Sequence, residues 1–117
     1  DGQVISCAHN NREHTMDATG HAELVAIRDA CKALGGWHLE ECTLYVTLEP
    51  CPMCMGAMVN SRMGKVVYGA KDAKAGACGS VFDMRFYPLN HKPKVEGGVC
   101  DKACSEILSE FFAQRRK

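Results

Sequence analysis

The fold is decided by residues 43–54, which read TLYVTLEPCPMC. The run from Thr43 to Leu48 is β-branched, aromatic or aliphatic, and its length suits a β-strand. Pro50 then ends the strand, because proline has no backbone N–H to give to a sheet. Cys51 is expected to begin a helix that continues to about Met63. A strand followed at once by a helix is the unit from which α/β folds are built.

The segment upstream predicts a second helix, which begins at His21. Four residues with apolar or thiol side chains recur there at three- and four-residue steps and should form one buried face: Leu24, Ile27, Cys31 and Leu34. Gly35-Gly36 is expected to end this helix, as glycine does in a left-handed cap. The polar residues 9–20 predict a loop before it.

The segments downstream continue the alternation of strands and helices. We expect a short strand at 65–69, a long functional loop at 71–93 with one short helical turn, a weak strand at 95–99 and a final helix capped by Asp101. Alternating strands and helices predict an α/β layered fold whose central sheet is mixed but mostly parallel and is flanked by helices.

The first residues predict a hairpin. Asp1-Gly2 is a strong two-residue turn signal, and the strand-like residues 4–8 follow it. Since a hairpin needs a strand on each side of its turn, we expect a partner strand to belong before residue 1.

The length and composition predict one ordinary globular domain spanning residues 1–117, in which 46% of residues are hydrophobic and 24% are charged. Lys and Arg together number 14, as do Asp and Glu, so the formal net charge is zero. The overall charge therefore gives no indication of nucleic acid binding. No apolar stretch is long enough for a membrane span, and no secretory signal opens the chain. The eight cysteines indicate metal binding and buried thiols in a reducing cytoplasm rather than a disulfide framework.

Two short motifs predict a zinc site. His21 and the pair Cys51 and Cys54 offer one imidazole and two thiolates, each at the expected start of a helix. Three protein ligands leave the fourth position of a zinc ion open for water, as in catalytic sites. The alternative is a closed structural site, completed by one further residue from a set of five: Cys7, His9, His14, Cys42 and Cys78.

Glu23 favours the catalytic interpretation. One zinc ion per chain would make hydroxide available at neutral pH, because zinc lowers the pKa of a bound water to about 7. A carboxylate two residues from His21 would then take up the proton of that water, pass it to a substrate nitrogen and later protonate the leaving group. Glu23 is therefore expected to be a proton shuttle and not a zinc ligand.

The motif H-x-E with P-C-x-x-C is also a known signature of zinc-dependent nucleobase deaminases. Around it the chain closely resembles the bacterial tRNA adenosine deaminase family. The resemblance is carried by Asn10, by residues 17–23, 44–54, 56–58, 61–62, 66–74 and 76–80, and by the ending Phe111-Phe112 with Arg115-Arg116. The resemblance implies a cytidine-deaminase-like fold, a homodimer, and hydrolytic deamination of the wobble adenosine to inosine in a tRNA anticodon stem-loop.

The resemblance also implies roles for single residues. His21, Cys51 and Cys54 would be the zinc ligands and Glu23 the catalytic residue. Six further positions would contact the substrate: Asn10, Ala22, Leu48, Asp72, Lys74 and Phe112. Anticodon bases suit such an enzyme, because they can be turned out of a loop into a pocket without melting a duplex.

Two features depart from the family pattern, and two other functions stay open. We expect the family's N-terminal helix and first strand to be missing from the sequence that begins at Asp1, and Ala18 stands where a proline is common in the family. The same motifs also suit a deaminase of guanine or another free nucleobase. A function of a different class is an inactive RNA-binding or dimerisation module, against which Glu23 argues, since binding alone needs no proton shuttle.

Overall fold

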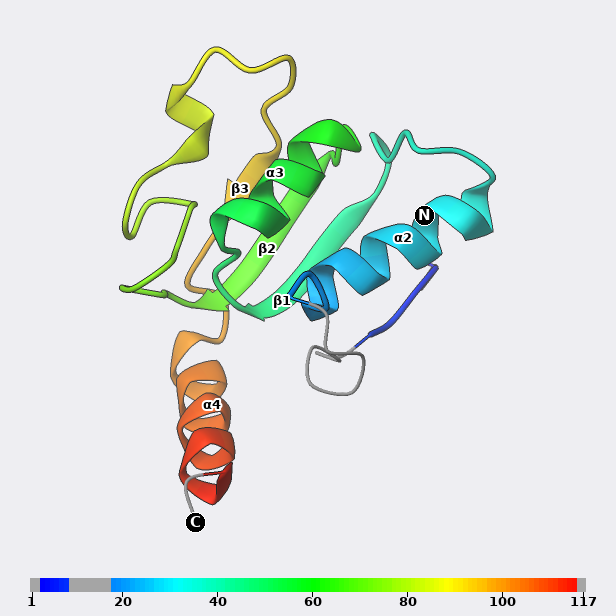
Figure 1. Cartoon of the computed structure of the whole chain (residues 1–117). Helices are drawn as coiled ribbons and strands as arrows, with labels where there is room; N and C mark the ends of the chain where they lie inside the picture. The colour runs from blue at the N-terminus through cyan, green and yellow to red at the C-terminus, as the bar shows by residue number, and fades with distance from the viewer. Residues whose placement is uncertain (1–2, 9–17, 116–117) are drawn as a thin grey trace.

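The computed structural model contains one parallel sheet of three strands in the order β1-β2-β3 (Figure 1). It describes residues 3–8 and 18–115, and side chains up to residue 108. The strands are β1 (Thr43–Leu48), β2 (Lys65–Ala70) and β3 (Lys94–Glu96), and both pairings are parallel. The α/β layered fold and the mostly parallel sheet are thereby confirmed.

Helices α2 (Ala22–Leu34) and α3 (Pro52–Asn60) contact each other and lie over one face of the sheet (Figure 1). A short 3-10 helix, η1 (Met84–Phe86), lies in the long loop between β2 and β3, where one helical turn was predicted. The last helix, α4 (Asp101–Arg115), contacts β2 and β1 and extends away from the end of the sheet (Figure 1).

The hydrophobic core lies between the sheet and helices α2 and α3. Strand β2 is central, and all its residues after Lys65 are buried. Strand β1 alternates instead, with Leu44 buried and Tyr45 exposed, because one of its faces has no cover. The core side chains are Ile27, Ala30, Leu39, Leu44, Cys54, Met55, Met58, Met63, Val66, Tyr68, Ala77 and Cys78.

Several predicted boundaries move by a few residues. Helix α3 ends at Asn60 rather than near Met63, because Arg62 adopts a positive φ of 60° that turns the chain towards β2. Strand β3 begins at Lys94 and stops at Glu96, before the pair Gly97-Gly98. The buried face of α2 is shorter than predicted, because Leu34, at the last position before the Gly35 cap, is 52% exposed.

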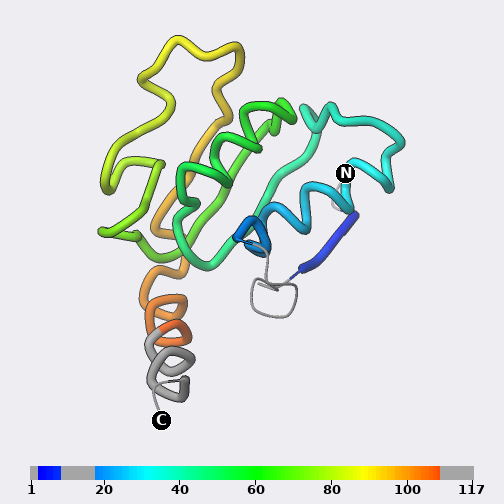
Figure 2. The backbone as a smooth tube through the Cα atoms, in the orientation of Figure 1, coloured from blue at the N-terminus to red at the C-terminus, as the bar shows by residue number. Residues whose placement is uncertain are grey.

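The predicted strand at residues 4–8 is wrong. Residues 3–8 form no strand in the structure and run alongside α2 instead (Figure 2). The Oγ of Ser6 donates a 2.8 Å hydrogen bond to the carbonyl of Ala26, and Val4 is 80% exposed. Strand propensity is expressed only when a second strand is there to pair with. The predicted turn at Asp1-Gly2 and most of the loop at 9–20 lie outside the described residues.

Across residues 3–8 and 18–115, none of the helices combines the length and the apolar character that crossing a membrane requires. The single-domain organisation stays a prediction.

Candidate metal centre and active site

His21 stands at the N-terminus of α2 as its N-cap residue. Its backbone is extended, with φ −67° and ψ 144°, and its side chain makes no capping hydrogen bond. The imidazole is therefore free to point forward from the helix, in the direction of the unpaired N–H groups of the first turn. Glu23 lies in that same turn.

Cys51 occupies the equivalent position on α3. Its backbone is also extended, its side chain makes no capping hydrogen bond, and Pro52 follows at the first helical position, where the missing N–H costs nothing. Cys54 lies three residues further on and is fully buried. Both thiols therefore project from the first turn of one helix, as the C-x-x-C spacing predicts.

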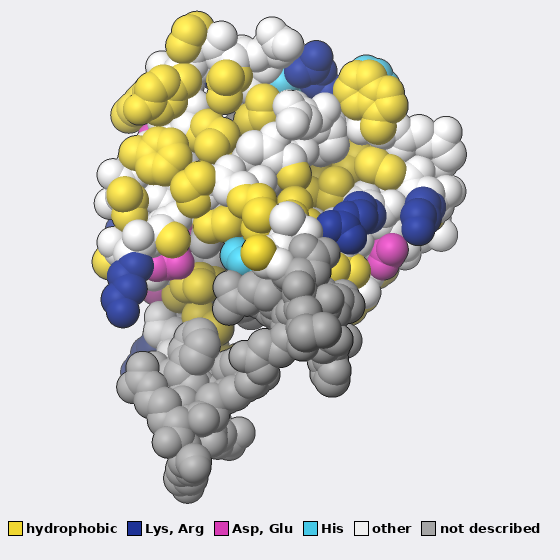
Figure 3. Space-filling model, viewed as in Figure 1, with side chains coloured by type: hydrophobic (Ala, Val, Ile, Leu, Met, Phe, Trp, Pro, Cys, Tyr) yellow, Lys and Arg dark blue, Asp and Glu magenta, His cyan; other side chains and the backbone are white. Residues whose placement is uncertain are grey.

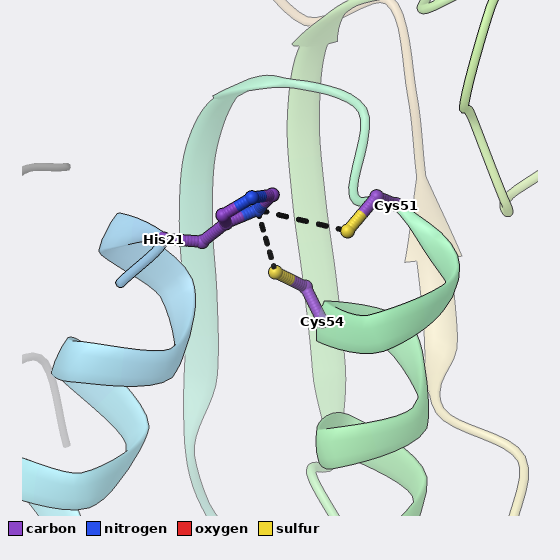
Figure 4. A group of neighbouring side chains, drawn as sticks. All are labelled: His21, Cys51 and Cys54. Atoms are coloured by element: carbon purple, nitrogen blue, oxygen red, sulfur yellow. Dashed lines mark hydrogen bonds between the residues drawn. The ribbon is translucent and has the colours of Figure 1, made fainter. Parts of the chain in front are cut away.

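The three side chains converge on one point (Figure 4). The Nδ1 atom of His21 lies 3.7 Å from the Sγ of Cys51 and 3.5 Å from the Sγ of Cys54. All three donor atoms lie within 4.8 Å of one another. With bonds of about 2.3 Å to sulfur and about 2.0 Å to nitrogen, a tetrahedral zinc ion would hold N and S about 3.5 Å apart. The donor set therefore fits zinc in both chemistry and spacing.

The charges around Cys54 point to a cation as well. Burial raises the pKa of the Cys54 thiol far above its usual value, and the charges of Glu23 and Cys51 beside it raise it further. A divalent cation among these groups would reverse that effect, because it favours the deprotonated thiol.

The closed structural site has no support among the described residues. His21, Cys51 and Cys54 are the only group of three or more potential ligands found there. Cys78 is a buried thiol whose pKa is raised by burial to about 12, and it contacts the Sδ of Met55. It is therefore a neutral core residue. Cys7 and Cys42 also lie outside the group, and His9 and His14 are not among the described residues.

A groove of about 660 Å³ runs beside Glu23. Its walls are the segment 3–8 on one side and residues 43–47 of β1 on the other. Residues of α2 line it between these walls: Ala22, Glu23, Ala26, Ile27 and Ala30. Glu23 is half-buried there, and its carboxylate also lies within hydrogen-bonding reach of the Cys54 thiol. Glu23 therefore contacts both the groove and the Cys54 thiol, whereas His21, Cys51 and Cys54 themselves do not line the groove.

Residues 1–116 match the family described as MafB19-like deaminases. The chain belongs to this family. The tRNA-specific adenosine deaminase of Bacillus subtilis (strain 168) is 50% identical to this deaminase over 117 residues, which cover 99% of this chain and 73% of that protein. The resemblance predicted from the sequence is confirmed.

Solved structures agree with this relationship. One, from a study of A-to-I editing by tRNA:A34 deaminases at the wobble position of transfer RNA, has a TM-score of 0.84 and 42% identity over 92% of this chain and 78% of its own. The guanine deaminase of Bacillus subtilis is also similar, with a TM-score of 0.61 and 37% identity over 100% of this chain and 75% of its own.

The other predicted site residues differ in whether they line the groove. Ala22 lines the groove next to Glu23, whereas Leu48, Asp72 and Lys74 do not. Leu48 and Ala70 are register partners at the carboxyl ends of β1 and β2, so Asp72 follows at the same end of the sheet from which α3 departs. Asn10 and the side chain of Phe112 lie outside the described residues.

Sequence reasoning missed Glu49. Its side chain is only 2% exposed, yet it is ionisable and lies between β1 and Cys51. Burial alone would raise its pKa. Hydrogen bonds from the Ser80 hydroxyl and from the backbone N–H groups of Asp72, Cys78 and Ser80 outweigh burial and hold the pKa of Glu49 below its usual value. A carboxylate between the end of a strand and the Pro50-Cys51 turn was the one signal in the sequence that could have drawn attention to it.

Proposed function

We propose that this deaminase converts the wobble adenosine of a tRNA anticodon loop to inosine, with water consumed and ammonia released. The observation that carries the proposal is the meeting of His21, Cys51 and Cys54 at the starts of two helices, with Glu23 beside them. Three donors and a neighbouring carboxylate are what metal-assisted deamination requires. The 50% identity to a tRNA-specific adenosine deaminase supports adenosine in tRNA as the substrate.

The three donors would hold one zinc ion per chain. Zinc in this position supplies an activated water at neutral pH. The Nδ1 of His21 would be the ligand atom, since it is the ring nitrogen that faces both sulfurs. The N-termini of α2 and α3 both begin at these ligands, and their partial positive charge favours thiolates and developing negative charge.

Glu23 would move the protons. It would accept a proton from the attacking water and deliver it to the ring nitrogen next to the reacting carbon. It would then take the proton of the hydroxyl group added at that carbon and pass it to the amino group, which leaves as ammonia while the carbonyl forms. A single carboxylate can act as base and then as acid only if it stays free of the metal. The half-buried position of Glu23 beside the groove suits this role.

The substrate contacts would come from six residues. Ala22 would face the flipped base with its backbone, Asn10 would hydrogen-bond it, and Leu48 would form part of the pocket wall. Asp72 and Lys74 would contact the RNA beside the target nucleotide. The remaining residue, Phe112, would support the pocket from α4.

A homodimer in the cytoplasm completes the proposal. Helix α3 carries no charged residue at all, and Met53, Gly56 and Ala57 on it stay partly exposed. The loop between β2 and β3 adds four exposed apolar side chains: Val81, Phe86, Tyr87 and Leu89. Apolar side chains are widespread on the face of the molecule that Figure 3 shows. Exposed apolar surface of this kind is typical of subunit contacts. A second copy of the chain is the occupant we expect.

The second candidate function is guanine deamination, favoured by the likeness to the guanine deaminase of Bacillus subtilis. The deciding experiment incubates the zinc-loaded protein with an anticodon hairpin carrying adenosine at the wobble position and, separately, with free guanine and cytosine. Inosine in the hairpin and no ammonia from the free bases supports the proposal. Ammonia from guanine with an unchanged hairpin would replace it by the second candidate.

Glu23→Ala separates an enzyme from a binding module. The loss of general acid–base catalysis should lower kcat by about 10²- to 10⁴-fold, while one zinc per chain remains because the three donors are intact. Inosine formation and metal content measured on the same sample test both parts. Turnover equal to that of the unaltered protein would contradict the role of Glu23.

A further inference from the structure

The loop at residues 72–80 is held by a single buried side chain, that of Glu49. One carboxylate oxygen, Oε1, accepts hydrogen bonds from the backbone N–H of Asp72, at 3.1 Å, and from the Ser80 hydroxyl. The other, Oε2, accepts from the backbone N–H of Cys78, at 2.9 Å, and of Ser80, at 3.2 Å. All four donors belong to this one loop.

The same carboxylate is also fixed to the metal-binding turn. Glu49 immediately precedes Pro50 and Cys51, and its own backbone N–H donates a 2.9 Å hydrogen bond to the carbonyl of Ala70 on β2. The carbonyl of Pro50 accepts a 2.9 Å hydrogen bond from the N–H of Ala77. The loop and the turn that carries Cys51 are therefore joined by side-chain and backbone bonds at one place.

Further hydrogen bonds connect Glu49 to Asp72 and Lys74, the residues proposed to contact the RNA. Asp72, whose N–H is held by Glu49, uses its own Oδ1 to accept hydrogen bonds from the N–H groups of Lys74, at 3.0 Å, and Ala75, at 3.1 Å. The carbonyl of Asp72 accepts a further 2.9 Å bond from the N–H of Gly76. The Asp72–Lys74 turn thus takes its position from the Glu49 carboxylate.

The Glu49 carboxylate is also closely packed against the loop. A Cβ atom added at Gly76 would overlap the carboxylate carbon of Glu49 and crowd the carbonyl of Asp72. Only glycine lets the loop approach this closely. A carboxylate with four donors and no free space has one position available to it.

We infer that Glu49 is a positioning residue, which holds the Asp72–Lys74 turn at a fixed place relative to the metal ligand Cys51. The inference rests on the proposed function, because it assigns the loop to the RNA and Cys51 to the metal. Glu49 acts through Asp72, Lys74 and Cys51 and touches neither the metal nor the base. Its effect is on where the RNA lies when the target adenosine enters the site.

The first test is Glu49→Gln. An amide offers one acceptor oxygen in place of two and turns an N–H₂ group towards N–H donors, so at least two of the four hydrogen bonds are lost. We expect the KM for the anticodon hairpin to rise by about 10- to 100-fold, since a small misplacement of binding groups has effects of this size. Zinc content should stay at one per chain, and the amides of residues 72–80 should exchange hydrogen faster.

Two further variants keep the test decisive if Glu49→Gln fails to fold. Ser80→Ala removes one donor from an exposed residue and should raise the KM by about 2- to 10-fold. Gly76→Ala displaces the carboxylate from the other side and should reproduce the exchange pattern of Glu49→Gln. The matched control for it is Gly36→Ala, where an added Cβ meets nothing within 4 Å.

Asp83→Asn controls for the loss of any buried carboxylate in this region, because the hydrogen bonds of the Asp83 side chain to described residues all go to Arg85, two residues away. It should leave the KM unchanged. An unaltered KM and unaltered exchange at 72–80 in folded Glu49→Gln and Ser80→Ala would overturn the inference. The unaltered protein is assayed first, so that failure of the hairpin reaction itself is recognised as failure of the proposed function; hydrogen exchange tests the positioning role in either case.

Discussion

Three acidic side chains of the same chemistry have different tasks because their surroundings differ. Glu23, the proposed proton shuttle, lies half-buried beside an open groove and near a thiol. Glu49 is almost fully buried and accepts four hydrogen bonds, so it stays ionised and organises a loop. Asp83 pairs with Arg85 at 2.6 Å and caps η1. The environment of each carboxylate, and not its residue type, decides its role.

Asp83 gives the clearest pH dependence. Hydrogen bonds from the Arg85 side chain outweigh burial and hold the pKa of Asp83 below its usual range. A lowered folded-state pKa means that the ion pair contributes its full stability above about pH 4, the ordinary pKa of aspartate, and loses it as the pH falls through the lower folded value. Asp83→Asn should therefore cost about 1–2 kcal/mol at pH 7.

That cost should shrink as the pH falls below about 4, because the unaltered protein then loses the charge that asparagine never had. Urea unfolding of both proteins at pH 7, 5, 4 and 3 measures the difference directly. Comparing the two proteins at each pH removes the contribution of Glu49, which titrates in both. An equal difference at pH 7 and pH 3 would contradict the assigned ion pair.

At the scale of elements, the position of α4 depends on Gly69. The strand β2 carries this glycine at its point of contact with the helix, and an added Cβ would overlap the Sγ of Cys104 and lie 2.8 Å from its Cβ. It would also lie 3.0 Å from the carbonyl of Thr47. The helix can approach the sheet this closely only because the side chain is missing.

Gly69→Ala should therefore push α4 outward and destabilise the protein by about 1–3 kcal/mol, as overpacking does. Cys104→Ala removes the overlapping sulfur, so the double variant should recover part of the loss. Thermal unfolding of the two single variants and the double variant gives the coupling between the positions. Additive losses with no recovery would mean that Cys104 does not pack on Gly69.

The elements were predictable to different degrees. The local residue pattern predicted the bounds of α2, β1, α3 and β2 to within three residues. Each of these segments has its own spacing of apolar residues and its own glycine or proline at an end. The grouping of His21, Cys51 and Cys54 followed for the same reason, since each stands at the start of a helix. The four bonds of Glu49 span 23 to 31 residues and leave no local pattern. The strand predicted at residues 4–8 was wrong because strand propensity does not supply a second strand to pair with.

At the scale of the whole molecule, the candidate metal centre lies where two parts of the core meet. Helices α2 and α3 come from separate stretches of the chain and meet over the sheet, and their ligands are 30 and 33 residues apart in sequence. An ion held by all three donors would cross-link the two helices at their starts. Folding and metal binding should then be coupled, because the unfolded chain does not bring the donors together.

Removal of zinc should therefore lower the melting temperature. Free zinc at about one hundred times its dissociation constant stabilises the folded state by about 2.7 kcal/mol, which corresponds to about 10 °C for a chain of this length. Thermal unfolding with zinc, with a chelator, and after zinc is restored measures the shift and its reversal. Cys51→Ser, which takes one donor from the centre, should unfold at nearly the same temperature in all three conditions. If the chelator does not change the melting temperature of the unaltered protein, the three donors do not link α2 to α3 through a metal.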